Sequence, residues 1–216
     1  MTEIREWLQI RKNFYAFLYR MYLEEPPREL AEDLVNKKFP IPDLESLNED
    51  MAEGFEVVKK FMKTSKDVDE VHEKLTDEYT RLFIGPGRLP VPPYESMYID
   101  GTMMGKSLLE VKKVYRKAGV GKSGDYAEPE DYIAFELKFM HWLCEEGINA
   151  VDNERVKECL TLQKDFMNEH LMRWVPKFCD DLYESKRSDF YKGIAKVTKG
   201  FLLLDSELID ELLECL

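Results

Sequence analysis

The chain has 216 residues, of which 43 are acidic and 31 basic, so its formal net charge is −12. Hydrophobic residues make up 44% and charged residues 34% of the sequence, a composition that excludes a disordered or membrane-embedded chain. The acidic excess argues against a nucleic-acid binder, which needs clustered positive charge.

Apolar residues at three- and four-residue steps predict a helix over most of the first 26 residues. Its N-cap is Thr2, and Pro26 ends it. The apolar positions of this helix are Trp7, Ile10, Phe14, Phe17, Leu18 and Met21. Three more helices follow: one over 30–35, one from about Asp43 to Met62, and one that Asp67 caps and that reaches Phe83.

The helical pattern stops between Gly85 and Gly101. Residues 85–93 hold four of the ten prolines, and proline cannot donate a helix hydrogen bond. The segment is nevertheless rich in apolar residues, unlike a solvated linker. We therefore expect a rigid, non-helical segment that packs against the helices and lines a groove.

A helix over 103–118 comes next, followed by the glycine-rich stretch 119–124. This stretch matches the pattern GxGxxG, but a phosphate-binding loop needs a preceding strand, and Arg116 occupies the position of its first glycine. A glycine that ends the helix, Gly119, and a hinge after it explain the stretch better.

The next predicted helix has Pro129 in its first turn and ends at Gly147. It is apolar almost all round, which favours a central buried position. A long helix then reaches Pro176, which ends or kinks it, and the tail from Ser188 forms one or two more. The sequence thus predicts an all-α bundle of roughly eight helices in one domain, 1–216, with lobes 1–118 and 125–216 joined at 119–124 as an option.

The N-terminal residues, the hydropathy and the cysteines indicate the cellular compartment of the protein. Charges at Glu3 and Arg5 precede any apolar run, so no signal peptide is visible, and no window is apolar enough to span a membrane. The four cysteines form no CxxC pair and are expected to be buried thiols. We expect a reduced, cytoplasmic protein with no metal and no cofactor. The cysteines are Cys144, Cys159, Cys179 and Cys215.

Two local features are candidates for binding. Glu128, Glu130 and Asp131 lie together at a helix start, where acids complement the helix dipole or could form a receptor for an arginine. On physical grounds alone we favour the dipole explanation. Tyr94 and Tyr98 either cover the core or contact an extended peptide; Glu95 and Ser96 add polar groups to the same apolar wall.

Several motifs in order along the chain resemble the TorD/DmsD/NarJ-type chaperones, also called redox enzyme maturation proteins. The motifs are Tyr79-x-x-Leu82-Phe83-x-Gly85-Pro86, Pro92-Pro93-Tyr94-Glu95-Ser96-x-Tyr98, Glu128-Pro129-x-Asp131, Phe166-x-x-x-His170-Leu171-x-x-Trp174 and Phe190-Tyr191. The resemblance runs from about Tyr79 to Leu204.

This resemblance implies an all-helical cytoplasmic chaperone that is not an enzyme. Members of the family bind the twin-arginine signal peptide, or a related N-terminal segment, of a molybdopterin-dependent oxidoreductase subunit. They hold it during cofactor insertion and so delay export. Some relatives form domain-swapped dimers, and weak GTP binding has been attributed to some; neither follows from the residues of this chain, which we expect to be a monomer or such a dimer.

Carried over by position, the resemblance assigns peptide binding to the segment Pro93–Tyr98 and to the motif that starts at Glu128. The candidate residues are Tyr94, Glu95, Ser96, Tyr98, Glu128, Asp131 and Tyr132. Tyr132 stands where the family usually has histidine, and the position of Tyr94 is often tryptophan in relatives. Both departures bear on peptide specificity.

Two other functions stay open from the sequence. The chain could assemble a non-exported, nitrate-reductase-type subunit, as NarJ-like proteins do. Alternatively, an all-α enzyme could use Glu128 and Asp131 as general acid and base, although the sequence shows no nucleophile, metal cluster or intact phosphate loop beside them.

Overall fold

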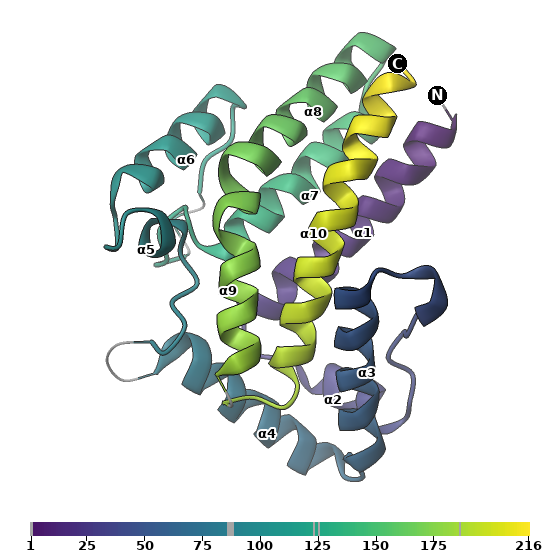
Figure 1. Cartoon of the computed structure of the whole chain (residues 1–216), viewed down its shortest axis with the longest axis vertical. Coiled ribbons are helices and arrows are strands. Elements are labelled where there is room, and N and C mark those ends of the chain that lie inside the picture. Colours follow the sequence, from purple (N-terminus) through teal and green to yellow (C-terminus); the bar gives the residue numbers. More distant parts are fainter. Residues whose placement is uncertain (1, 86–88, 123, 125, 186) are drawn as a thin grey trace. The chain divides into compact units, whose positions relative to one another are not determined.

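The computed structural model describes residues 2–85, 89–122, 124, 126–185 and 187–216. Within them the chain is helical and contains no β-strand, which confirms the all-α prediction (Figure 1). The helices are α1 (Thr2–Leu23), α2 (Arg28–Val35), α3 (Glu49–Thr64), α4 (Val68–Tyr79), α5 (Glu95–Ile99), α6 (Lys106–Lys117), α7 (Ile133–Asn149), α8 (Asn153–Phe166), α9 (Met172–Glu184) and α10 (Tyr191–Glu214). Short 3₁₀ and π turns add η1 (Leu44–Ser46), η2 (Thr80–Ile84) and η3 (Met167–Leu171). Pro86, Gly87 and Arg88 of the proline-rich stretch and Ser123 of the glycine-rich stretch lie outside the described residues.

The chain forms two compact units. The first comprises Met1–Leu23, Pro93–Val175 and Leu203–Leu216, and the second Glu24–Pro92 and Pro176–Leu202. These boundaries differ from those of the predicted lobes, and 119–124 falls within the first unit, so a hinge there stays a prediction. No helix of the described residues is long and apolar enough to cross a membrane.

The first unit is built around α7, which packs against α1 on one side and α8 on another (Figure 1). Ten of its residues are buried, as the near-continuous apolar run predicts. Gly147 lies inside α7 and does not end it, contrary to the prediction. A Cβ at Gly147 would lie 3.0 Å from Cδ1 of Leu8 in α1, so the missing side chain permits the close approach of these two helices.

The apolar stripe predicted for α1 is only partly correct. Trp7 and Ile10 are 40% and 53% exposed, whereas the buried face contains a charged residue, Arg11. The guanidinium of Arg11 is bidentate to the carboxylate of Asp205 in α10, with N···O distances of 2.5 and 3.0 Å. Tyr15 donates its hydroxyl to the same carboxylate at 2.5 Å.

This buried network changes the ionisation of its members. Burial, the largest single cause, lowers the pKa of Arg11, but the charge and hydrogen bond of Asp205 together with Cys144 and Tyr15 outweigh it, so the net pKa is raised. Burial, followed by the charge of Asp205, raises the pKa of Tyr15. Burial likewise raises the pKa of the neighbouring thiol of Cys144 to about 12. All three side chains therefore hold their protons at neutral pH.

The second unit packs α3 against the first half of α10 through two glycines. A Cβ at Gly54 would lie 2.7 Å from the carbonyl oxygen of Gly193, and a Cβ at Gly193 would lie 2.9 Å from that of Gly54. The turn before α10 is fixed by Glu78, a buried acid of α4 that accepts the backbone N–H groups of Asp189 and Phe190 at 3.0 and 3.1 Å. The core of this unit thus depends on two glycines and one buried carboxylate.

Helix boundaries differ from the prediction at three places. α3 starts at Glu49 behind the N-cap Asn48, which accepts the N–H of Met51, while Asp43 caps η1. Pro129 precedes α7 and does not lie in its first turn. Pro176 lies inside α9 and does not end it. The tail is the single helix α10, one of the two predicted options. The cap Asp67 and the helix-ending Gly119, with a φ of +80°, are confirmed.

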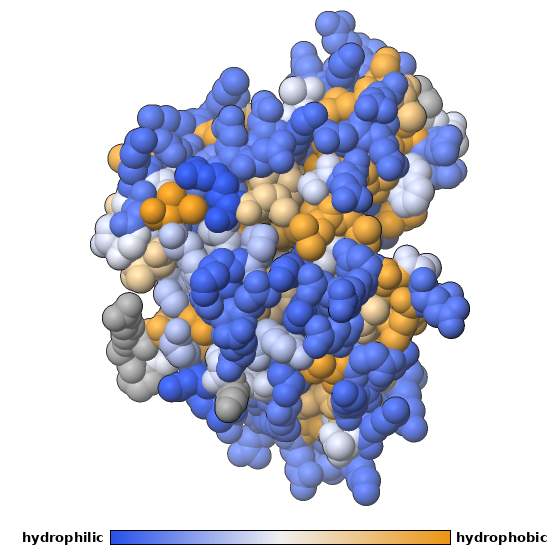
Figure 2. Space-filling model, viewed as in Figure 1, coloured by the Kyte–Doolittle hydropathy of each residue, from blue (hydrophilic) through white to orange (hydrophobic). Residues whose placement is uncertain are grey.

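Polar residues cover most of the face viewed in Figure 2, in keeping with an acidic chain whose charges are solvated. Three of the four cysteines are buried free thiols, while Cys215 is exposed, contrary to the prediction. Among the described residues no group of three or more His, Cys, Asp or Glu is arranged to hold a metal ion.

We predict that Asp205→Asn destabilises the protein by about 3–5 kcal/mol, because it leaves the Arg11 guanidinium buried without a counter-charge. The control is the triple variant Arg11→Met, Tyr15→Phe and Asp205→Leu, which removes the whole polar network and should recover most of that loss. Urea unfolding measures both. A cost below about 1 kcal/mol for Asp205→Asn would show that the ion pair does not hold α10 to α1.

Candidate functional site

The predicted site residues lie in two segments that the fold pairs backbone to backbone. The carbonyl of Pro93 accepts the N–H of Ile133 at 3.0 Å, and the N–H of Glu95 donates to the carbonyl of Asp131 at 3.0 Å. Tyr94 and Tyr132 lie opposite each other as an isolated antiparallel bridge. We call this pairing of 93–95 with 131–133 the clip.

The side chain of Asp131 closes the clip at the start of α5. It is fully buried, and its Oδ2 accepts the backbone N–H of Ser96 at 2.9 Å. Because the N-cap residue Tyr94 makes no side-chain cap, this carboxylate caps the helix from the opposite segment. The prediction of a fully non-helical stretch 85–101 is therefore wrong over Glu95–Ile99.

Both tyrosines of the bridge are anchored by their hydroxyls. Tyr94 donates to Oε2 of Glu128 at 2.5 Å, and Tyr132 donates to the carbonyl of Tyr22 at the end of α1. Their rings pack with a centroid distance of 5.5 Å. Tyr132, at the position where the family usually has histidine, thus ties the clip to α1.

Two further acids lie fully buried beneath the clip. Oε2 of Glu95 is 2.9 Å from Nδ1 of His170, and Oε2 of Glu136 in α7 accepts the indole N–H of Trp174 at 3.0 Å. The other carboxyl oxygens of Glu95, Asp131 and Glu136 are buried and have no hydrogen-bond partner among the described residues. Three carboxyl groups therefore share one buried environment.

This crowding governs the ionisation of Glu136. Burial is the largest cause that raises its pKa, and the negative charges of Glu95 and Asp131 raise it further, while the bond from Trp174 opposes the rise. Glu136 therefore holds its proton to a higher pH than an exposed glutamate does.

The structure brings all seven predicted site residues to this one region, but it buries most of them. Tyr94, Glu95, Ser96, Asp131 and Tyr132 are buried. Tyr98 and Glu128 are only partly covered, and Tyr98 packs on the ring of Trp174 with a centroid distance of 5.6 Å. The buried five belong to the packing around the clip, and only Tyr98 and Glu128 of the seven have side chains that are partly exposed.

Three residues of this region were not among the predicted site residues: Glu136, His170 and Trp174. A glutamate inside an almost wholly apolar helix is a signal for Glu136, because such a residue needs a buried partner. His170 and Trp174 are four residues apart, which places them on one helical face. Both signals are in the sequence, but only the fold shows that they converge on one cluster.

Comparison with known proteins places the chain among redox chaperones. The model of the family described as nitrate reductase delta subunit matches residues 44–180. A "Chaperone protein TorD" of Vibrio cholerae is 25% identical over 175 residues, which is 81% of this chain and 78% of that protein. Another TorD, of Vibrio parahaemolyticus, is 26% identical over 213 residues and covers 95% and 97% of the two chains. A "Probable Tat proofreading chaperone DmsD" of Haemophilus influenzae is 31% identical over 144 residues, 63% of this chain and 65% of its own.

We predict that Glu136→Gln makes stability less dependent on pH. The raised pKa means that the folded state binds this proton more tightly than the unfolded state, so this contribution to stability falls as pH rises above the ordinary value of 4.5 until Glu136 ionises. A glutamine side chain still accepts the indole N–H of Trp174, but unlike glutamate it does not ionise. The variant should therefore gain stability over the wild type as pH rises from 5 to 8, by at most about 1.4 kcal/mol per pH unit.

Urea unfolding at four pH values measures this difference, and Glu6→Gln, on the exposed face of α1, is the control that should leave the pH profile unchanged. Parallel profiles for wild type and Glu136→Gln would mean that Glu136 is ionised in the folded protein.

Proposed function

This chain belongs to the nitrate reductase delta subunit family and is a maturation chaperone, not an enzyme, and we propose that it binds the N-terminal twin-arginine segment of a molybdopterin-dependent oxidoreductase subunit. It acts in the cytoplasm, where it holds this segment during cofactor insertion and delays export. The resemblance to the TorD/DmsD/NarJ-type chaperones is confirmed by the family match. The observation that carries the peptide-binding proposal is that all seven implicated residues meet at the clip.

The exposed side of the clip gives these residues different roles. Glu128 is partly exposed, and the hydroxyl of Tyr94 fixes its carboxylate at 2.5 Å. A carboxylate has about four acceptor sites, so Glu128 can accept a guanidinium in addition to this hydroxyl. Asp131 is fully buried and caps α5. We therefore assign the arginine contact to Glu128 and a positioning role to Asp131.

Apolar contacts supply most of the affinity in this proposal. One ion pair at a partly exposed site contributes only about 0.2–1 kcal/mol, or more when it is desolvated, whereas each buried apolar side chain of the peptide contributes roughly 1.5–3 kcal/mol. The net charge of −12 mainly raises the rate of encounter with a basic peptide.

A second client class is favoured by the family description itself, which names a nitrate reductase subunit. A non-exported, nitrate-reductase-type subunit would present an N-terminal segment without paired arginines. Co-purification of the tagged full chain from its native cells separates the two, because the captured molybdopterin oxidoreductase subunit either carries or lacks adjacent arginines at its N-terminus.

We predict that Glu128→Gln weakens binding of a synthetic peptide with two adjacent arginines and a following apolar stretch by about tenfold, or about 1.4 kcal/mol. Glutamine keeps an acceptor for Tyr94, so the clip stays intact while the charge is lost. Isothermal titration calorimetry at 50 and 300 mM salt measures the affinity, and the salt dependence should shrink in the variant.

Glu6→Gln is the matched control, since it removes one exposed acid of α1 in the same unit and should leave the affinity unchanged. Equal affinity of wild type and Glu128→Gln would overturn the arginine assignment. If the wild type binds neither this peptide nor the N-terminal segment of its co-purified client, peptide binding itself fails.

A further inference from the structure

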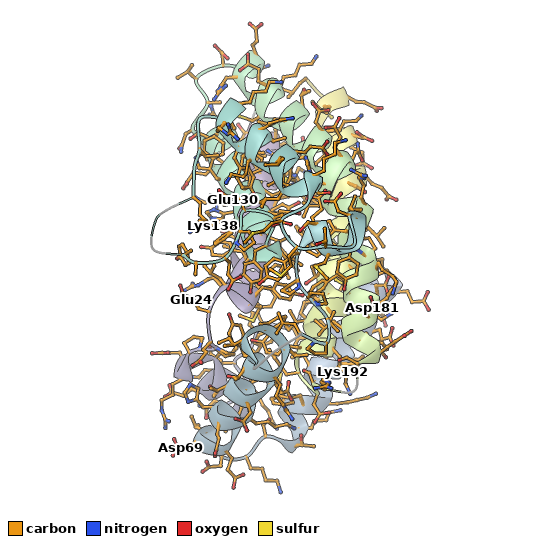
Figure 3. The ribbon with its side chains drawn as sticks, turned by 90° about the vertical axis from the view of Figure 1, so that its left-hand side faces the viewer. Glu24, Asp69, Glu130, Lys138, Asp181 and Lys192 are labelled. Carbon is orange, nitrogen blue, oxygen red and sulfur yellow. The ribbon has the colours of Figure 1, made fainter. Side chains whose placement is uncertain are left out.

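A cavity of about 240 Å³ lies beside the clip in the first unit, between the end of α6 and one face of α7. Its lining is dominated by five aromatic rings, those of Tyr115, Tyr126, Phe135, Phe139 and Trp142. Glu130 and Lys138 also line it, and Figure 3 shows these two side chains close together. Ligand sites usually have volumes of roughly 300–1,000 Å³, so this cavity suits one large side chain better than a cofactor.

The sequence builds this cavity with a helix end and a helix face. At the end of α6 the N–H of Val120 donates to the carbonyl of Tyr115 at 3.0 Å, and the N–H of Gly119 to that of Arg116 at 3.1 Å. With the left-handed φ of Gly119, this is a Schellman motif, which turns the chain so that Val120 lies against Tyr115. On α7, Phe135, Phe139 and Trp142 follow at helical spacing on one face.

The charges around the cavity select against a cationic occupant. Glu130 is already paired with Lys112 at 3.0 Å. Burial acts to raise the pKa of Glu130, but Lys112, a backbone hydrogen bond and the charge of Lys122 together outweigh burial, and the pKa is lowered. The ammonium of Lys138 lies 5.4 Å from the ring centroid of Tyr126, and that of Lys122 donates to the carbonyl of Glu128 at 2.7 Å. Two ammonium groups thus line a cavity whose carboxylate is neutralised, and a guanidinium would be repelled there.

We propose that this cavity holds one uncharged apolar side chain, such as leucine or phenylalanine, from the client's N-terminal segment. This inference rests on the proposed function and deepens it, because it gives the apolar part of the peptide its own receptor. An uncharged apolar side chain matches the aromatic lining and the volume of the cavity, and the lysines at the edge do not repel it. Lys122 lines the cavity and donates to the backbone carbonyl of Glu128, so the cavity lies next to the segment that carries the proposed arginine contact.

The test fills the cavity from its edge. Val120→Trp places an indole in the space, and the probe is a fluorescein-labelled peptide with two adjacent arginines followed by leucines and alanines. We expect the affinity to fall about ten- to a hundredfold, as for loss of a buried apolar anchor. Val151→Trp is the matched control, because Val151 is 91% exposed in the same unit, and its affinity should equal that of the wild type.

Two further arms make the result specific. Among peptides that each carry one serine in place of one leucine, one should bind the wild type more weakly by the same factor, and Val120→Trp should no longer distinguish that peptide from the leucine peptide. Gly121→Trp is the second filling variant if Val120→Trp does not fold, since a Cβ at Gly121 meets no atom within 4 Å.

The outcomes separate the inference from the proposed function. Wild-type affinity in both filling variants overturns the apolar anchor and leaves peptide binding standing. If filling the cavity instead removes the response to replacing the arginines by glutamines, the cavity takes arginine and the inference is wrong. If the wild type does not bind the peptide at all, both fail together.

Discussion

The site depends on one hydrogen bond across the clip, from the backbone N–H of Ser96 to the carboxylate of Asp131. Five-residue α5 makes too few internal bonds to be stable alone, and its first turn has no side-chain cap of its own. Asp131 supplies that cap and, through the adjoining backbone pairs of Glu95 and Ile133, fixes where the tyrosines and Glu128 stand. The residues that we propose for peptide binding are thus held in place by Asp131, to which the proposal gives no contact with the peptide.

The position of Asp131 has a consequence for its neighbours. A buried ionised carboxylate costs several kcal/mol unless donors compensate it, and Asp131, Glu95 and Glu136 are all fully buried. Each has one donor or proton partner: the N–H of Ser96, the imidazole of His170 and the indole of Trp174. Since a single donor for each acid does not offset three buried charges, the pKa of Glu136 is raised. These buried polar groups therefore favour the pairing of 93–95 with 131–133 over other arrangements of the two segments, at some cost in the free energy of unfolding.

Local signals in the sequence were sufficient to predict the all-α class and those helix ends that carry their own cap residue, such as Asp67. They failed where the deciding partner is distant in the chain. The buried face of α1 could not be predicted, because Arg11 is buried only through Asp205, 194 positions away. α5 was missed because its cap comes from Asp131. The grouping of the site residues followed from the resemblance to a family, but their burial did not, since exposure is a property of the packed molecule.

The proposed division into a charged subsite and an apolar subsite provides a physical basis for selecting peptides by the order of their arginine and apolar residues. A lone carboxylate accepts any cation, and a lone aromatic cavity accepts any apolar side chain, so neither is selective. Glu128 and Phe135 are both fixed by the same clip, one just before it and one just after it, so the two subsites have a set separation. In the proposed site, a peptide satisfies both subsites only if its arginine and its apolar residue are spaced to match. The reverse order is disfavoured because Lys122 and Lys138 repel an arginine from the cavity. Under this proposal selectivity comes from the fixed geometry, while the overall charge of −12 mainly affects how often peptides arrive.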